Sequence, residues 1–134
     1  MQVILATHGP VASGMKEGLA MFFGQAISDK ICALELRSGM SPDSYMEMFK
    51  EVINKDNEEV LILVDIQSGT PFNTSALIID EYKDRNIQCI SGVNMPILME
   101  VASSFEDMDV DTLVANIKQI AADSVVDLRE LLEI

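Results

Sequence analysis

The amino-acid sequence predicts an α/β fold: an open, doubly wound sheet, mostly parallel, with strand order 2-1-3-4 and helices on both faces. One indication is that short apolar runs alternate along the chain with segments of helical periodicity. A second is that these runs are continuously apolar, which is typical of parallel strands buried on both faces. Strands that alternate with helices in this way form right-handed βαβ units.

The length and composition indicate one globular domain. The chain has 134 residues, of which 49% are hydrophobic and 23% charged, and it holds no internal repeat or linker-like stretch. Residues 1–134 are therefore expected to form a single domain. The formal net charge of −13 disfavours binding to nucleic acids and anionic membranes, and it favours basic partners.

The predicted strands are four β-branched or aliphatic runs, and the third of them ends in Asp65-Ile66. In a doubly wound sheet the first and third strands are neighbours, on either side of the point where the strand order reverses. In chain order the predicted strands cover residues 2–7, 30–36, 60–66 and 87–91.

Helical periodicity and start signals mark the segments between and after the strands. A helix is expected over residues 10–23, Ser41-Pro42 and Thr70-Pro71 each combine a cap with a first-turn proline, and Asp109 opens a further helix. The expected inward stripes are Val11, Met15, Leu19 and Phe22; Tyr45, Met48, Phe49 and Val52; Leu77, Ile78 and Tyr82; and Val110, Leu113, Val114, Ile117 and Ile120.

The C-terminal tail, residues 124–134, fits two patterns. The even spacing of Val126, Leu128, Leu132 and Ile134 is that of a strand. Val125, Leu128 and Leu132 also fit one face of a helix. The pattern alone leaves strand and helix equally open.

The sequence predicts a cytoplasmic protein, since it contains no recognisable membrane span or export signal. Its apolar stretches are far shorter than the roughly 20 residues that cross a bilayer, and a strand-like run begins at Met1 in place of a basic leader. Cys32 and Cys89 lie in apolar runs and are predicted to stay reduced, without a disulfide.

His8 and Asp65 are the residues best suited to chemistry, because ligands of open α/β sheets bind beyond the carboxyl ends of the strands at the switch point. His8, the only histidine, ends the first strand. Gly9 is expected to free an N–H group, and Pro10 begins a helix whose N-terminus favours an anion. The carboxylate of Asp65 can accept a hydrogen bond from one imidazole nitrogen and leave the other as a nucleophile.

A polar loop follows Asp65 directly. It contains Ser68, Gly69 and Thr70 at a helix start, so hydroxyls, backbone amides and a helix dipole are expected to face one space. Taken singly, His8, Asp65 and this loop also fit an ordinary strand end, turn and βα connection. Taken together they predict a histidine that faces an anion-holding loop.

Most other chemistries lack their motifs in this chain. The P-loop, the Gly-x-Gly-x-x-Gly fingerprint and the Gly-x-Ser-x-Gly elbow are missing, and one histidine cannot build a histidine-rich metal site, so we expect no cofactor and no metal. A phosphoryl-accepting histidine remains, since phosphoryl transfer needs mainly positioning and charge stabilisation. Two alternatives stay open: a non-enzymatic module that binds an anion at Thr70, and an isomerase-like enzyme that uses His8 and Asp65 but lacks an evident second acid.

Three sequence blocks are specific in their order and spacing: Ile4-Leu5-Ala6-Thr7-His8-Gly9, Val64-Asp65-Ile66-Gln67-Ser68-Gly69-Thr70-Pro71-Phe72-Asn73 and Gly92-Val93-Asn94-Met95-Pro96. With these blocks, and over nearly its whole length, the chain resembles the EIIA component of the mannose-type (mannose–fructose–sorbose) phosphotransferase system. The phosphocarrier subunit of dihydroxyacetone kinase has a related first domain. Its histidine motif lacks the Gly-Pro that follows His8, which favours the sugar-transport branch.

The resemblance implies a cytoplasmic phosphocarrier. His8 would accept a phosphoryl group from phospho-HPr and pass it to a histidine of the EIIB component, while Asp65 orients the imidazole. The modified nitrogen would be Nε2, with Nδ1 facing Asp65. The expected phosphate-binding residues are Gly9, Ser68, Gly69 and Thr70.

The resemblance also implies a homodimer in which residues 124–134 form an antiparallel strand exchanged with the partner's sheet. Gln67 stands where some family members carry a tryptophan, so contacts of that side chain are not carried over. Docking of the protein partners is expected at three apolar residues near the site, Met15, Phe72 and Met95. The sequence does not indicate which sugar is transported.

Overall fold

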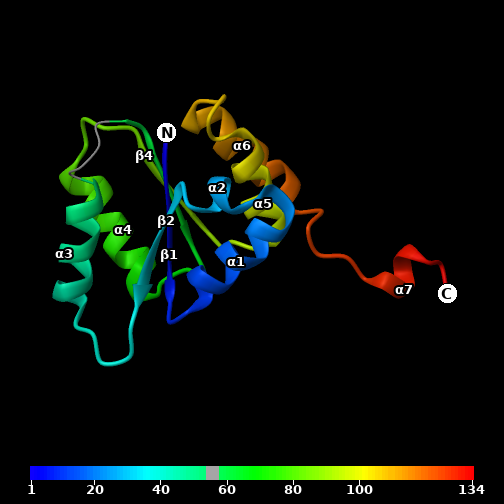
Figure 1. The fold of residues 1–134 in the computed structure, drawn as a ribbon, viewed down its shortest axis with the longest axis horizontal. Helices are drawn as coiled ribbons and strands as arrows, with labels where there is room; N and C mark the ends of the chain where they lie inside the picture. Colours follow the sequence, from blue (N-terminus) through cyan, green and yellow to red (C-terminus); the bar gives the residue numbers. More distant parts are fainter. Residues whose placement is uncertain (54–57) are drawn as a thin grey trace.

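The structure, a computed structural model, describes residues 1–53 and 58–134. The strands within these ranges form one sheet of four parallel strands in the order β2-β1-β3-β4. Helices cover both faces of the sheet (Figure 1). The predicted doubly wound α/β class and the predicted strand order are confirmed.

The strands are β1 (Gln2–His8), β2 (Ile31–Leu36), β3 (Val60–Val64) and β4 (Ile87–Ser91). The helices are α1 (Val11–Phe23), α2 (Gln25–Ser28), α3 (Pro42–Ile53), α4 (Thr70–Glu81), α5 (Met95–Ser104), α6 (Val110–Ala121) and α7 (Leu128–Leu131). Strand β1 pairs with β2 on one side and with β3 on the other. The switch point therefore lies beside the carboxyl end of β1.

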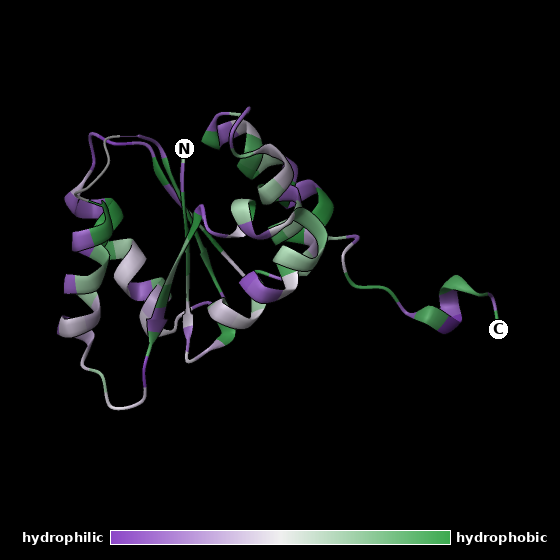
Figure 2. Ribbon diagram, in the orientation of Figure 1, coloured by the Kyte–Doolittle hydropathy of each residue, from purple (hydrophilic) through white to green (hydrophobic). Residues whose placement is uncertain are grey.

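Two apolar cores lie on opposite faces of the sheet. Val3 and Leu5 of β1 pack with α1, α5 and α6, whereas Ile4 and Ala6 pack with α3 and α4. All residues of β3 are buried, which explains its continuous apolar run, and Figure 2 shows the hydrophobic strands between the two helical layers. Since side chains alternate along a strand, His8 belongs to the face of Ile4 and Ala6, the one covered by α3 and α4.

Helix α1 packs through a stripe that is rotated from the predicted one. Ala12 and Leu19 are buried and Phe23 packs against the same core, whereas Val11 and Phe22 are 43% and 67% exposed. Adjacent positions of this helix are apolar on more than one face, so periodicity does not distinguish the stripes. The predicted inward positions of Val11 and Phe22 are therefore wrong, as is that of Leu77 in α4, which is 60% exposed.

The helix starts follow the predicted caps with one correction. The side chains of Ser41 and Asp109 accept hydrogen bonds from the backbone N–H groups three residues later, at 3.1 and 2.8 Å. Helix α4 begins at Thr70 itself, its cap residue is Gly69, and no side chain caps it. Thr70 thus lies in the first turn of α4, where its backbone is already helical.

Helix α5 was not predicted, although its start signal is present in the sequence. The side-chain oxygen Oδ1 of Asn94 accepts a hydrogen bond from the Ile97 N–H at 2.9 Å, and Pro96 lies in the first turn. The short helix α2 was also missed. Four residues are too few to show a helical period.

The tail, residues 124–134, forms no strand within the single chain. It runs away from the sheet and ends in α7, capped by Asp127, whose side chain accepts from the Arg129 N–H at 2.9 Å (Figure 1). The backbone of a strand needs a neighbouring strand to bond with, and this segment lies apart from the sheet. The exchanged strand of a dimer stays a prediction. The exposed large apolar residues of the tail are Val125, Val126, Leu128, Leu131, Leu132 and Ile134.

Two sequence-based expectations concern the environment of the chain. In the described ranges no helix is both long enough and apolar enough to span a bilayer. Cys32 and Cys89 are half-buried and form no disulfide, as predicted. Burial raises the pKa of the Cys89 thiol, so little of it is ionised at neutral pH.

Candidate functional site

His8 lies at the carboxyl edge of the sheet, at the end of strand β1 and beside the point where the strand order reverses. His8 is the last residue of β1, and the chain turns at Gly9, whose φ of +53° lies in the left-handed region that glycine tolerates best. The Gly9 N–H donates to the Leu36 carbonyl at 2.8 Å. This amide is already paired, so the expectation that Gly9 frees an N–H group is wrong. Gly9 contributes the turn.

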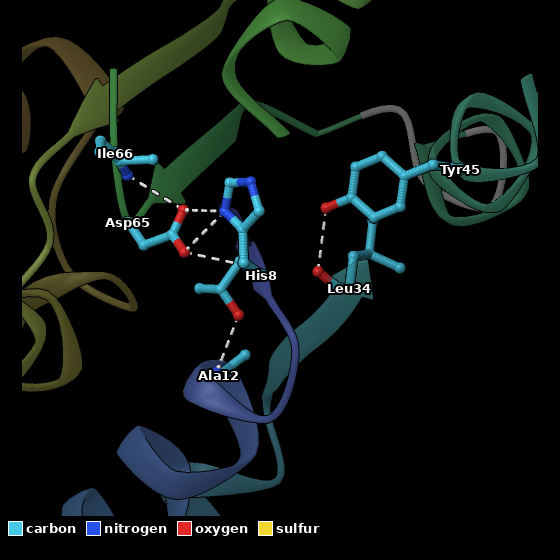
Figure 3. Close-up of polar contacts among 7 residues, drawn as sticks. His8, Ala12, Leu34, Tyr45, Asp65 and Ile66 are labelled. Atoms are coloured by element: carbon cyan, nitrogen blue, oxygen red, sulfur yellow. Dashed lines mark hydrogen bonds and ion pairs between the residues drawn. The ribbon is translucent and has the colours of Figure 1, made fainter. Parts of the chain in front are cut away.

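Asp65 holds His8 through both its backbone and its ring (Figure 3). The His8 N–H donates to Asp65 Oδ2 at 2.9 Å, and ring atom Nδ1 lies 3.0 Å from Oδ2 and 3.2 Å from Oδ1. The Ile66 N–H donates to Oδ1 at 3.0 Å. The carboxylate is thus fixed by two backbone donors, and it fixes the imidazole in turn.

These contacts decide which ring nitrogen is available. A carboxylate only accepts hydrogen bonds, so Nδ1 bears the proton of the neutral imidazole and the lone pair lies on Nε2. The His8 side chain is 44% exposed, whereas that of Asp65 is 19% exposed. The imidazole is therefore partly open to solvent, whereas the carboxylate that orients it is mostly covered.

Of the predicted phosphate-binding residues in the loop after Asp65, Gly69 lies at the imidazole, and Ser68 and Thr70 precede and follow it in the chain. Gly69 is so close that a Cβ atom there would lie 2.7 Å from His8 Cε1. Ser68 adopts a φ of +65°, a left-handed conformation that is strained in residues other than glycine. Thr70 opens α4 and lines a cavity of about 210 Å³ between α3 and α4.

The N-terminus of α1, where an anion was expected beside His8, already has its own partners. The Ala12 N–H donates to Thr7 Oγ1 at 2.9 Å. Both the N–H and the hydroxyl of Ser13 donate to Glu35, whose carboxylate also pairs with Arg37 at 3.0 Å. The anion at this helix start is therefore a carboxylate of the chain itself, and α4 is the helix start next to the ring that lacks a side-chain cap.

The sequence matches the family model EIIA-man, described as the PTS system fructose IIA component, over residues 2–118. The chain belongs to the mannose-type EIIA family. A fructose-specific EIIA component of Bacillus subtilis is 33% identical over 126 residues, which cover 92% of this chain and 84% of that protein. A sorbose-specific EIIA component of Lacticaseibacillus casei is 28% identical, covering 97% and 92%.

Solved structures agree with this assignment. The crystal structure of a phosphotransferase system EIIA component from Streptococcus agalactiae has a TM-score of 0.88 and 28% identity. The match covers 96% of this chain and 98% of that one. The chain is therefore an EIIA component of a sugar phosphotransferase system, a class of phosphotransfer proteins.

The sequence of this EIIA component predicts Tyr45 only as a core residue. It is fully buried on α3, and its hydroxyl donates to the Leu34 carbonyl at 3.0 Å (Figure 3). Burial, and secondly the negative charge of Asp65, raises the pKa of Tyr45 above its ordinary 10.0. Its position near Asp65 depends on how α3 packs on the sheet, which periodicity does not reveal.

Replacing Tyr45 with phenylalanine is expected to cost about 1 kcal/mol of unfolding free energy at pH 7.5, because the Leu34 carbonyl loses its buried donor. The unfolded chain ionises Tyr45 near pH 10, before the folded one, so the wild type loses stability as the pH rises further. The phenylalanine variant lacks this loss, and the stability gap should shrink above pH 10. Urea unfolding at pH 7.5 and 10.5 measures it, and a constant gap would contradict the account.

The three expected docking residues of this EIIA component are partly buried. Met15 and Met95 pack against the core of α1, α5 and α6, and Phe72 packs against the core of α3 and α4. The terminal methyl of Met95 would lie 3.5 Å from a Cβ atom at Gly18, so it covers α1 closely. Each of these side chains thus has a packing role, whatever it contributes to docking.

Proposed function

We propose that this EIIA component accepts a phosphoryl group on His8 Nε2 from phospho-HPr and passes it to a histidine of an EIIB component during sugar uptake. The observation that supports the proposal most is the pairing of His8 Nδ1 with Asp65 at 3.0 Å, which leaves the other nitrogen unprotonated on a ring that is 44% exposed. Since each partner in turn must reach the same nitrogen, a half-exposed ring on a strand end suits both exchanges.

The transfer needs no base to remove a proton. The Nε2 lone pair attacks phosphorus as the bond from phosphorus to the HPr histidine breaks, and the ring of His8 gains positive charge. The Nδ1 proton stays on the ring, and the carboxylate of Asp65 stabilises the new charge at hydrogen-bond distance. In the second step a nitrogen of the EIIB histidine attacks the same phosphorus, the N–P bond to His8 breaks, and its electron pair returns to Nε2.

The N-terminus of α4 is the proposed binding site of the phosphoryl oxygens. Gly69 lies against the imidazole edge that includes Nε2, and α4 starts there without a side-chain cap. Uncapped N–H groups and the positive end of the helix dipole favour an anion at such a start. The hydroxyls of Ser68 and Thr70 add donors from the same loop, whereas Gly9 is left out because its amide is paired.

The overall charge supports the choice of partners. With Asp and Glu numbering 22 against 9 Lys and Arg, the chain attracts basic protein surfaces and speeds their association at low salt. We propose that the whole chain acts as one cytoplasmic domain and that Met15, Phe72 and Met95 contribute apolar contacts to docking.

Phosphorylation of the purified wild-type chain tests the proposal. It is incubated with labelled phosphoenolpyruvate, the enzyme that phosphorylates HPr, and HPr, then with an EIIB component. We expect an adduct that is labile in acid and stable in alkali, that maps to His8, and that moves to EIIB. No adduct, or one on a hydroxyl, would overturn the proposal. Omitting HPr is the control.

We further propose that the chain dimerises through the tail, residues 124–134. Its apolar side chains, such as Val125 with 86% exposure, have no cover in the single chain. Deleting the tail is therefore expected to convert a dimer into a monomer, measured by sedimentation equilibrium. A full-length variant with Val126 and Leu128 replaced by serine controls for chain length and should weaken the dimer too. An unaltered dimer after the deletion, or a monomeric wild type, would refute the exchange.

A further inference from the structure

We propose that Gly69 is a positioning residue for His8: the missing side chain at this position sets where the imidazole lies between Asp65 and the start of α4. The part that concerns transfer rests on the proposed function. The decisive geometry is that a Cβ atom on residue 69 would lie 2.7 Å from His8 Cε1 and 3.2 Å from Nε2.

Glycine is required here by space and not by backbone conformation. Gly69 has φ −83° and ψ 172°, an extended conformation that any residue adopts. The neighbours of the absent Cβ are the functional ring itself and Ile66 Cγ2, at 3.2 Å. The imidazole therefore occupies the space that any side chain at position 69 would need.

The ring is confined from two sides. Asp65 fixes Nδ1 at 3.0 Å, and Gly69 meets the edge formed by Cε1 and Nε2. Carbon atoms in contact prefer separations of about 3.5–4.0 Å, so a Cβ at 2.7 Å would push the ring by roughly 1 Å. A shift of this size takes Nδ1 out of hydrogen-bond range of the carboxylate or turns the ring away from it.

Gly69 also keeps the start of α4 open. The cap residues Ser41, Asn94 and Asp109 place a side-chain oxygen on the first amides of their helices. A serine or aspartate at position 69 would do the same and would collide with the ring as well. One absent side chain thus serves two purposes, ring placement and an uncapped helix start directly beside the ring.

The test compares Gly69→Ala with Gly14→Ala, whose added Cβ meets no atom within 4 Å and whose φ is not in the left-handed region. The first readout needs no partner: ¹⁵N NMR of the imidazole at fixed pH. The wild type and Gly14→Ala should show the Nδ1-protonated form bonded to Asp65, whereas Gly69→Ala should show a mixture of tautomers. The second readout is the phosphorylation rate by phospho-HPr, which should fall about 100-fold only in Gly69→Ala.

Unchanged imidazole spectra in Gly69→Ala would overturn the inference. The spectra also separate its failure from that of the proposed function, because they are recorded whether or not the wild type is phosphorylated. If Gly69→Ala is poorly folded, a double-mutant cycle tests the inference instead. It compares the melting temperatures of the wild type, Gly69→Ala, His8→Ala and the double variant. The alanine should destabilise the wild type more than the His8→Ala background, where the ring is gone. Equal losses in the two backgrounds would also overturn it.

Discussion

Replacing His8 with alanine is expected to abolish phosphorylation by phospho-HPr and to leave the fold intact. No other histidine is present to form the N–P bond. The backbone N–H of residue 8 would still donate to Asp65, and the Ile66 N–H would still hold the carboxylate, so β1 and β3 stay tied at the site. Incorporation of labelled phosphate, beside circular dichroism and thermal unfolding, measures both parts of the prediction.

The same variant separates the phosphocarrier from the alternatives that the sequence left open. A non-enzymatic module would retain its partner or anion in His8→Ala, because such binding needs no N–P bond. A phosphorylated His8→Ala chain would show that the acceptor lies elsewhere. Folded but unreactive His8→Ala, next to a reactive wild type, is the outcome that the phosphocarrier requires.

The second large effect is expected for Asp65→Asn, which should slow phosphoryl transfer by about 30- to 1,000-fold, equivalent to roughly 2–4 kcal/mol in the transition state. An asparagine amide can donate a hydrogen bond to Nδ1, which moves the ring proton to Nε2 and removes the lone pair that attacks phosphorus. It also removes the negative charge that stabilises the phosphorylated ring. Rapid-quench measurement of the first transfer step tests this directly.

Asp80→Asn is the matched control, since it makes the same chemical change on the exposed surface of α4. The Asp80 carboxylate is 74% exposed and pairs with Lys83 at 2.9 Å, so its loss should leave transfer and stability nearly unchanged. Equal transfer rates in Asp65→Asn and the wild type would show that Asp65 only shapes the turn. Loss of the fold in Asp65→Asn would assign it a structural role instead.

The sheet could be predicted because its strands are buried on both faces. A run such as residues 60–64 is apolar at every position, so it does not resemble an amphipathic helix. The strands next to it in the sheet can be deduced from the strand order of doubly wound folds. The rotation of α1 could not be predicted, because Ala12 and Val11 are both apolar and only packing against the sheet chooses Ala12. The start of α5 does carry a sequence signal, since Asn94 caps the helix and Pro96 lies in its first turn.

The contact between His8 and the Asp65 side chain could be predicted, because the first and third strands of a doubly wound sheet are neighbours and both residues lie at the carboxyl ends of these strands. The details that correct it depend on contacts between distant parts of the chain. Leu36 takes the Gly9 amide because of the register between β1 and β2, and Glu35 reaches the first turn of α1 from the neighbouring strand. Sequence motifs do not encode such pairings.

The secondary structure of the tail, residues 124–134, could not be predicted for a different reason. Residues 124–134 present two patterns at once, strand-like and helix-like, and the single chain leaves the large apolar residues of this segment exposed. The family resemblance favoured the strand, while the isolated chain forms the short α7 after Asp127. The deletion experiment described above addresses this directly.

The proposed phosphoryl transfer depends on Asp65 holding Nδ1, so that Nε2 of His8 carries the phosphoryl group. The most direct measurement is ¹⁵N and ³¹P NMR of the wild-type chain after phosphorylation by phospho-HPr. We expect a one-bond coupling between phosphorus and Nε2, with Nδ1 still protonated. Coupling to Nδ1, or a phosphorus signal from any other residue, would contradict it.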